Sequence, residues 1–433
     1  MAADVFACLI FRARWKAERT PSSRGWSPGP LPLPIPAVEA AAGRAGESVV
    51  ADRSARTGYF SARVHDALYS AQDTGATGRW HRRSSGEPPE WTGAVVHDWE
   101  LLLDEEGGYA VAHVRLPQQA VEVLSELTKV RGEGRRWLSA LVDDVTFEPV
   151  RPRVVTHFCW AGDRIPEPVP DPAALASWSP MQRWQWFLAS GTSAADGLPD
   201  PADPRIFAGT VHLSSDWRAA ILRDGVTYTA LTSTEATDFH AVARAYVRSI
   251  HLDAVLLGLL QLNALHRIAD RIAGIRVDRT GAGAVESLEA EILDIRARLW
   301  WNNVSERGVQ VAEVLRAFQN QHRMADLYAQ VVADLDDISR YLQARRARLE
   351  DEALADAQAR QRRAEERHRV SEDRDRRNQT TIAVISFVLL PFAVTFSGAA
   401  VLAEPSVSAF AWSIVAALVL SLALAVASFL RDR

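Results

Sequence analysis

Two long stretches without a charged side chain close this sequence, and they constrain its fold more than any other feature. The first runs from Thr380 to Ala403 and the second from Pro405 to Leu430, with Glu404 as the only charge between them. A membrane-spanning helix needs about 20 mostly apolar residues. The sequence therefore predicts two transmembrane helices, at about 380–403 and 406–430, joined as a hairpin. A buried hairpin of a soluble protein is the alternative, but uncharged runs of this length seldom occur in soluble helices.

Basic residues flank the predicted hairpin on its outer sides only. Arg374, Arg376 and Arg377 precede the first span, and Arg431 and Arg433 follow the second, whereas the loop between the spans has no Lys or Arg. Loops rich in Lys and Arg stay on the cytoplasmic side of a membrane. We therefore expect a multi-pass protein of the inner (plasma) membrane, with both termini in the cytoplasm and the lipid bilayer as its partner.

Composition limits the remaining classes of function. The chain has 433 residues, enough for two or three domains, and a formal net charge of -5, which argues against a nucleic-acid partner. Its two cysteines, Cys8 and Cys159, do not indicate a disulfide framework. The sequence contains no phosphate-binding loop, nucleophile elbow or zinc-protease motif. We accordingly predict no enzyme activity and no bound cofactor.

The N-terminal half has the pattern of a cytoplasmic α/β domain. Residues 1–55 hold a predicted strand, Val5–Ala13, and the proline-rich stretch Pro21–Pro36, which is expected to be an extended linker or surface arm. Residues 56–233 alternate short β-rich runs with helical ones. The clearest element is a hairpin in which Val95–Leu103 and Tyr109–Leu116 are joined by a turn ending in two glycines.

The pattern becomes almost wholly helical between residues 234 and 378, which we interpret as a helical bundle and stalk leading into the hairpin at 379–433. Apolar residues from Val311 to Val332 recur at spacings of four and three, the pattern of a coiled-coil seam. Gln343–Arg377 is dense in charges of both signs, as in a solvated helix. Between Ser305 and Asn378 the sequence has no proline and only one glycine, Gly308, which predicts one helix running into the membrane.

Three groups of side chains could bind a ligand or could simply serve the fold. Large aromatics cluster at Trp178, Trp184 and Trp186, where packing onto the sheet competes with an aromatic binding surface. A histidine on the helical seam, His322, is either a core residue or a ligand-binding one. Two acid–histidine pairs could each take part in a metal site or could be ordinary polar residues: Asp238 with His240, and His251 with Asp253.

The order of an α/β domain, long helices and a C-terminal two-span hairpin resembles the CorA-type divalent cation channels. The first span enters through Thr380 and Thr381, has a proline near its middle at Pro391, and continues with small residues at Ser397 and Gly398, which is similar to the family's first span. The resemblance implies a CorA-like homopentamer, a coiled-coil stalk, and Mg²⁺ or another divalent cation as the transported or regulatory ion.

The chain departs from this family in one motif. The family's Gly-Met-Asn sequence ends the first span, whereas this chain has Ala400, Val401 and Leu402 at that place. The family's Asn helps to hold a hydrated cation at the pore mouth, so its replacement bears directly on magnesium selectivity.

If the first span lines the axis of an oligomer, its pore-facing side can be named. Thr381, Val388 and Thr395 are seven residues apart and therefore share one helix face. Copies of this face would give two rings of hydroxyls around an apolar constriction, and Glu404 would form an acidic ring at the outer mouth. Alternatively, the two threonines bond their own helix backbone and Glu404 only ends a helix.

The sequence thus supports two hypotheses of function. The first is an oligomeric membrane protein that transports ions, expected to be cations, including divalent metal ions. The second is a membrane-anchored sensor or effector, in which the hairpin oligomerises or perturbs the bilayer without selective transport.

Overall fold

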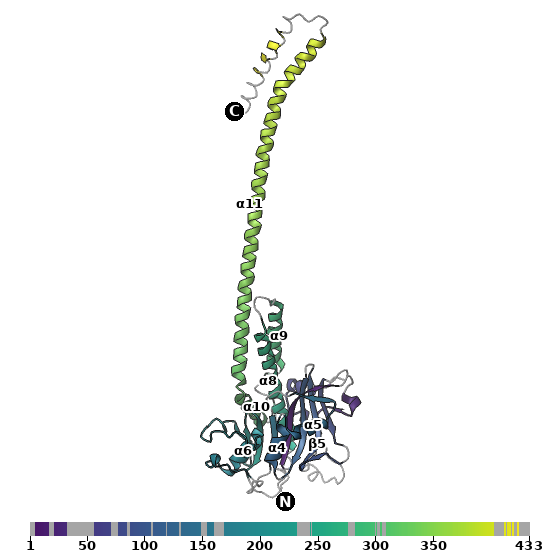
Figure 1. Cartoon of the computed structure of the whole chain (residues 1–433), viewed down its shortest axis with the longest axis vertical. Coiled ribbons are helices and arrows are strands. Elements are labelled where there is room, and N and C mark those ends of the chain that lie inside the picture. Colours follow the sequence, from purple (N-terminus) through teal and green to yellow (C-terminus); the bar gives the residue numbers. More distant parts are fainter. Residues whose placement is uncertain are drawn as a thin grey trace. The chain divides into compact units, whose positions relative to one another are not determined.

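In a computed structural model, the chain forms two compact units, Met1–Arg340 and Tyr341–Arg433. Figure 1 shows the whole chain. The structure describes residues 5–16, 21–32, 56–70, 77–84, 87–104, 107–117, 119–129, 131–148, 154–159, 169–231, 245–275, 282–298 and 309–401, with isolated positions at 243, 300, 304 and between 411 and 423. The first unit is a mixed α/β region followed by helices, and α11 (Met324–Val401) continues from the first unit into the second.

One largely antiparallel sheet forms the centre of the first unit, in the order β2-β3-β5-β6-β1-β8-β11-β10-β9. Among the strands described, only β8 and β11 pair in parallel. The strands are β1 Val5–Trp15, β2 Ser27–Pro28, β3 Gly78–Arg83, β4 Glu90–Trp91, β5 Ala94–Asp104, β6 Gly107–Leu116, β7 Val145–Phe147, β8 Val154–Cys159, β9 Thr210–His212, β10 Trp217–Ile221 and β11 Gly225–Ala230.

The predicted hairpin is confirmed as β5 and β6, and glycine is what permits its tight turn. Asp104 pairs with Gly107, so the strands come within two residues of each other along the chain. Gly107 and Gly108 have φ angles of 143° and 154°. A Cβ on Gly108 would lie 2.0 Å from the carbonyl oxygen of Leu102, a separation that no side chain tolerates. The sequence Gly-Gly is therefore required by the backbone.

Side chains of the sheet alternate between two apolar layers. On β1, Cys8 and Ile10 face one layer and Leu9 and Phe11 face the other. Helices α3, α8 and α10 cover the first face, and α4, α5 and α6 cover the second. The helices of this unit are α3 Ala62–Tyr69, α4 Ala120–Thr128, α5 Glu133–Ala140, α6 Pro180–Ser190, α8 Leu252–Ala273, α9 Ala282–Arg298 and α10 Val309–Gln321, with the short turns η1 Pro21–Arg24, η2 Ala173–Leu175 and η3 Val247–His251.

Helix α8 is the central helix of the first layer. It packs closely on α10 because Gly258 has no side chain, and a Cβ there would lie 2.5 Å from the ring of Phe318. α8 and α10 share one core with the sheet, in the same hydrophobic cluster as Ile10 and Tyr228. The start of the helical region is thus part of the α/β fold rather than a separate bundle.

The tryptophan cluster packs inside the protein, as one of the two interpretations proposed. α6 begins with a capping box between Ser179 and Gln182. Its residues Trp184 and Trp186 are 1% and 7% exposed, and the neighbouring Trp178 is 7% exposed. These indoles lie in the second apolar layer, so they do not form an exposed aromatic binding surface.

The described part of the proline-rich stretch is packed against the sheet, which corrects the expectation of a linker or surface arm. It contains β2, which pairs with β3, and the side chains of Trp26 and Leu31 are 2% and 1% exposed. Pro28 is tolerated because β2 is the outermost strand of the sheet order. Residues 33–36 of the predicted arm lie outside the described residues.

Within the described residues 309–401, the predicted unbroken helix is interrupted once, between α10 and α11. Arg323 has a left-handed backbone with φ 50°, and its side chain contacts Asp326 at 2.9 Å. A residue in this conformation ends one helix and starts another, because the helical φ is negative. The apolar seam from Val311 to Val332 is therefore divided between two helices, and the prediction of a single helix there is wrong.

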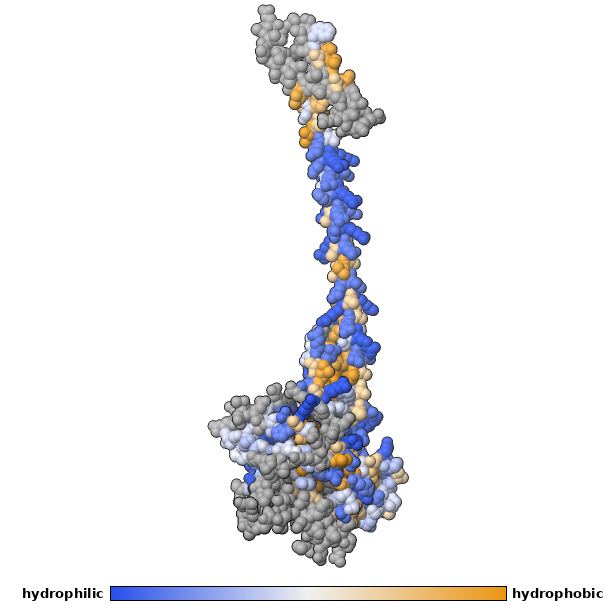
Figure 2. All heavy atoms as spheres, turned by 180° about the vertical axis from the view of Figure 1, so that it is seen from behind, coloured by the Kyte–Doolittle hydropathy of each residue, from blue (hydrophilic) through white to orange (hydrophobic). Residues whose placement is uncertain are grey.

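After this break α11 shows the expected change from polar to apolar surface. Its side chains from Gln343 to Arg377 are all exposed. Near its start, ion pairs form between residues three positions apart, such as Arg340 with Asp337 at 2.6 Å. Figure 2 shows a largely hydrophilic surface along this helix that becomes hydrophobic toward its far end. The helical backbone continues through the first predicted span to Val401.

Candidate functional site

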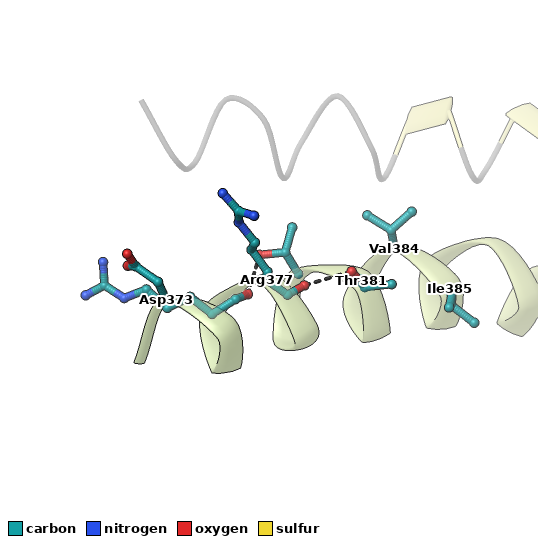
Figure 3. A pocket seen from close by; sticks show the side chains of 7 residues that line it. Asp373, Arg377, Thr381, Val384 and Ile385 are labelled. Carbon is teal, nitrogen blue, oxygen red and sulfur yellow. Dashed lines mark hydrogen bonds between the residues drawn. The ribbon is translucent and has the colours of Figure 1, made fainter. Parts of the chain in front are cut away.

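A hollow of about 640 Å³ lies beside α11 at the point where its charged part meets its apolar part (Figure 3). Its described lining changes in order along one side of the helix, from charged to hydroxyl-bearing to apolar side chains: Asp373, Arg376, Arg377, Thr380, Thr381, Val384 and Ile385. Such an order suits the boundary between water and a bilayer, because charged groups favour the aqueous side.

Thr381, the first predicted pore-facing residue, lies in this hollow. Its hydroxyl donates to the backbone carbonyl of Arg377 at 2.7 Å, and Thr380 bonds Arg376 in the same way at 2.8 Å. The helix thus satisfies the hydroxyl proton, as one of the two interpretations expected. The hydroxyl oxygen keeps lone pairs, and the residue is exposed, so Thr381 can still present an oxygen to an ion.

The other predicted site residues are placed only in part. Val388 and Thr395 belong to α11, whose backbone keeps them on the face of Thr381 by their seven-residue spacing. The structure does not describe their side chains, and Glu404 lies outside the described residues. The pore face and the acidic ring therefore stay predictions.

A second polar site, which the sequence did not predict, is buried between the sheet and α8. We call it the buried ion cluster; its members are Arg56, Arg79, Glu100, His113 and Asp253. Asp253 is at its centre and is 0% exposed. Its carboxylate accepts bonds from Nε and Nη2 of Arg56 at 2.6 and 2.7 Å, from Nη2 of Arg79 at 3.1 Å, and from the hydroxyl of Tyr69 at 2.6 Å.

Glu100 is the second carboxylate of the buried ion cluster. It accepts from Nε and Nη2 of Arg79 at 3.0 and 2.7 Å and from the backbone N–H of Leu31 at 3.1 Å. Its Oε1 lies 2.9 Å from Nε2 of His113. Two guanidinium groups thus balance two carboxylates, which is the condition for keeping charges inside a protein.

The cluster changes the pKa values of its members in opposite directions. Burial alone would raise the pKa of Glu100, but the guanidinium groups of Arg56 and Arg79 hold that pKa well below its ordinary value. Burial alone would lower the pKa of His113, but Cys8 and Glu100 raise it to about 9. Burial would also raise the pKa of the Cys8 thiol, but His113 keeps it lowered. His113 is therefore protonated at neutral pH.

Cys8, His113 and Glu100 form a thiol–imidazole–carboxylate series, with Sγ 3.5 Å from Nδ1 of His113. A nucleophilic cysteine uses such a series, but it must also reach its substrate. Cys8 is 3% exposed and His113 is 1% exposed, so no substrate atom can approach the sulfur. The arrangement serves the packing of the sheet against α3 and α8 rather than catalysis.

Two sequence signals could have indicated this cluster. Glu100 interrupts the apolar strand Val95–Leu103, and Asp253 interrupts the apolar start of α8. A carboxylate at a core position requires a buried cationic partner. The partners Arg56 and Arg79 could not be identified, because they come from segments without a distinctive pattern.

The metal-binding candidates receive no support from the described geometry. Asp253 is bound by arginines, and His251 is buried against the ring of Tyr228 at 5.3 Å between centroids. Burial lowers the pKa of His251 to about 4. Asp238 and His240 lie outside the described residues. In the part of the chain that the structure describes, no three or more His, Cys, Asp or Glu residues are grouped as metal ligands.

His322, the histidine of the predicted seam, follows the end of α10. Its ring packs on Phe318 at 4.3 Å between centroids. Burial, with the nearby charges of Arg223 and His266, lowers its pKa to about 4, so this histidine is neutral at physiological pH.

Among the described helices, one is long and apolar enough to cross a membrane, Val247–Ala273, and 72% of its apolar window is buried inside the first unit. It is the core helix α8 with its preceding turn. Comparisons with protein-family models, with curated proteins and with solved structures found no match for this chain.

Proposed function

We propose that this chain is a CorA-like oligomeric membrane protein that conducts ions through a path lined by its first span. The observation that carries the proposal is the continuity of α11. One helix leads from an exposed, charged surface through Arg374, Arg376 and Arg377 into an uncharged run and remains helical to Val401. A helix satisfies its own backbone hydrogen bonds, which a bilayer requires of any spanning segment.

The conduction path follows from the same helix. Thr381 presents a hydroxyl oxygen at the cytoplasmic end of the span, and Val388 and Thr395 follow on one face. In a ring of copies these residues supply alternating polar and apolar levels, and an apolar level can close a pore by excluding water. A pentamer is the assembly that the resemblance to CorA-type channels supports. That resemblance and the carboxylate of Glu404 are the two grounds for expecting a cation, such as a divalent metal ion.

Ion flux into liposomes that contain the purified protein tests this proposal. We expect uptake of at least one ion, and a reduced cation uptake in Glu404→Ala if cations pass an acidic outer ring. Ser406→Ala, two residues further along the chain at the start of the second predicted span, is the matched control because it removes no charge. The mass of the detergent-solubilised protein tests the assembly separately, and a stable monomer would remove the shared pore.

The second hypothesis, a membrane-anchored sensor or effector, is supported by Ala400, Val401 and Leu402, which stand where the channel family has its selectivity motif. A folded oligomer that carries no ion in either direction would refute conduction and support this role instead.

A further inference from the structure

The helix break between α10 and α11 has a packed histidine beside it. His322 follows the end of α10 directly, and the next residue, Arg323, has the left-handed φ of 50° that separates the two helices. The ring of His322 stacks on Phe318 with centroids 4.3 Å apart, and Phe318 in turn fills the space that Gly258 leaves on α8. The break is therefore held against the core of the first unit through this imidazole.

One ring nitrogen of His322 has no partner. Within the part of the chain that the structure describes, Nε2 is buried and takes part in no hydrogen bond. A neutral imidazole needs a proton on only one nitrogen, whereas an imidazolium carries a proton on both and a full charge. Burying an unpaired charge costs far more than burying an unpaired neutral nitrogen. The packed position of His322 therefore favours the neutral ring strongly.

The charged groups that act on His322 are basic. Burial, followed by the charges of Arg223 and His266, lowers the pKa of His322 to about 4. Arg223 lies in the turn between β10 and β11, and His266 is on α8. Burial also lowers the pKa of His266, which Asp270 raises and Arg12 and Arg223 lower further. When both histidines become protonated in acid, they add two positive charges beside Arg223 at the break.

The start of α11 is held by few side chains. In the stretch 324–335 the buried residues are Met324, Val331 and Leu335, and the others are half-buried or exposed. Segments with few buried apolar contacts open at a lower free energy than the core of a protein. A local opening at the break can therefore bring His322 into water while the sheet stays folded.

We infer that the joint between α10 and α11 is an acid-sensitive hinge, in which protonation of His322 releases the start of α11 from the rest of the first unit. A histidine in water has a pKa of about 6.5, so the open joint binds the proton more tightly than the closed one. The closed joint is thus most stable above pH 6.5 and loses stability as the pH falls toward 4. The hinge acts on the helix that continues into the predicted span, but it does not depend on ion conduction.

Hydrogen exchange of the full-length protein in detergent tests the hinge. The result is expressed as protection factors, which remove the direct effect of pH on amide exchange. Leu327 donates its backbone N–H to the carbonyl of Arg323 at 3.1 Å, so the amides of residues 327–335 report the start of α11. Between about pH 7 and about pH 5 their protection should fall by about tenfold.

Two variants of the joint separate His322 from other acid-sensitive groups. His322→Phe keeps an aromatic ring on Phe318 but cannot be protonated, so the protection of 327–335 should no longer change with pH. Arg223→Gln removes an exposed basic neighbour, which should raise the pKa of His322 and weaken the fall in protection. His368→Gln is the matched control, because His368 is an exposed histidine of the same helix, and it should behave as the wild type.

The protection of the sheet tells a local opening from unfolding of the whole unit. At both pH values the amides of 327–335 should be less protected than that of Ile10 on β1. Equal protection would mean that α11 opens only when the sheet unfolds, and this would overturn the hinge. A full pH dependence that persists in His322→Phe would overturn it as well, because another group would then carry the titration.

Discussion

Replacing Asp253 by asparagine tests the buried ion cluster most directly. The carboxylate is 0% exposed and accepts four hydrogen bonds, three of them from the guanidinium groups of Arg56 and Arg79. The amide keeps the shape but removes the charge, and it turns part of the acceptor surface into a donor facing other donors. The guanidinium groups of Arg56 and Arg79 and the protonated His113 then share the single carboxylate of Glu100.

The expected loss in the free energy of unfolding is large, because charges inside a protein are stabilised only by their partners. Breaking a buried ion pair by removing one partner costs about 3–5 kcal/mol. With a urea dependence of about 3 kcal/mol per molar, the midpoint of unfolding should fall by about 1 M or more.

Tryptophan fluorescence of the full-length protein in detergent can follow this transition. All tryptophans except Trp412 lie in Met1–Arg340, so the signal reports the first unit. Asp270→Asn is the matched control, because Asp270 is an exposed carboxylate on the same helix, α8. A surface change of this kind is expected to stay within about 0.5 kcal/mol. Equal midpoints for the two variants would show that Asp253 does not hold buried charges together.

Two further predictions concern the sheet. The pKa of His113 is raised from 6.5 to about 9, so its contribution to stability is complete below pH 6.5 and is lost as the pH rises through 9. The free energy of unfolding should therefore fall by about 3 kcal/mol over this pH range. Urea midpoints of the wild type should decrease with pH across this range, and those of His113→Gln should not. If the variant keeps the full slope, another group titrates. Gly108→Ala should destabilise the first unit by about 2 kcal/mol or more, because its Cβ meets the Leu102 carbonyl at 2.0 Å, whereas Gly197→Ala meets nothing within 4 Å and should be nearly neutral in the same assay.

Local patterns in the sequence predicted the elements whose causes are local. The β-rich runs Val95–Leu103 and Tyr109–Leu116, with two glycines before Tyr109, predict a hairpin without reference to the rest of the chain, and the structure confirms it. The sequence did not predict the helix break at Arg323, because nothing local marks it. Nothing in its neighbourhood resembles a helix stop, and the left-handed turn there has no glycine to announce it.

The proline-rich stretch shows how tertiary contacts override local composition. Prolines predicted an extended arm, and the backbone is indeed non-helical over most of the described part. The burial of Trp26 and Leu31 is what makes it part of the sheet, and that depends on apolar partners elsewhere in the first unit. The local sequence of an extended segment does not predict which part of the protein it packs against.

The candidate sites likewise divide into those that local sequence predicts and those that only tertiary contacts create. The sequence by itself determined the two uncharged runs, the arginines before the first run, and the shared helix face of Thr381, Val388 and Thr395, because all of these follow from residues that are neighbours along the chain. Only the tertiary structure decided that Arg56 bonds Asp253, which is 197 residues away along the chain. A helix face follows from neighbours along the chain, whereas a buried ion cluster exists only when the sheet and its covering helices close over both charges and exclude water.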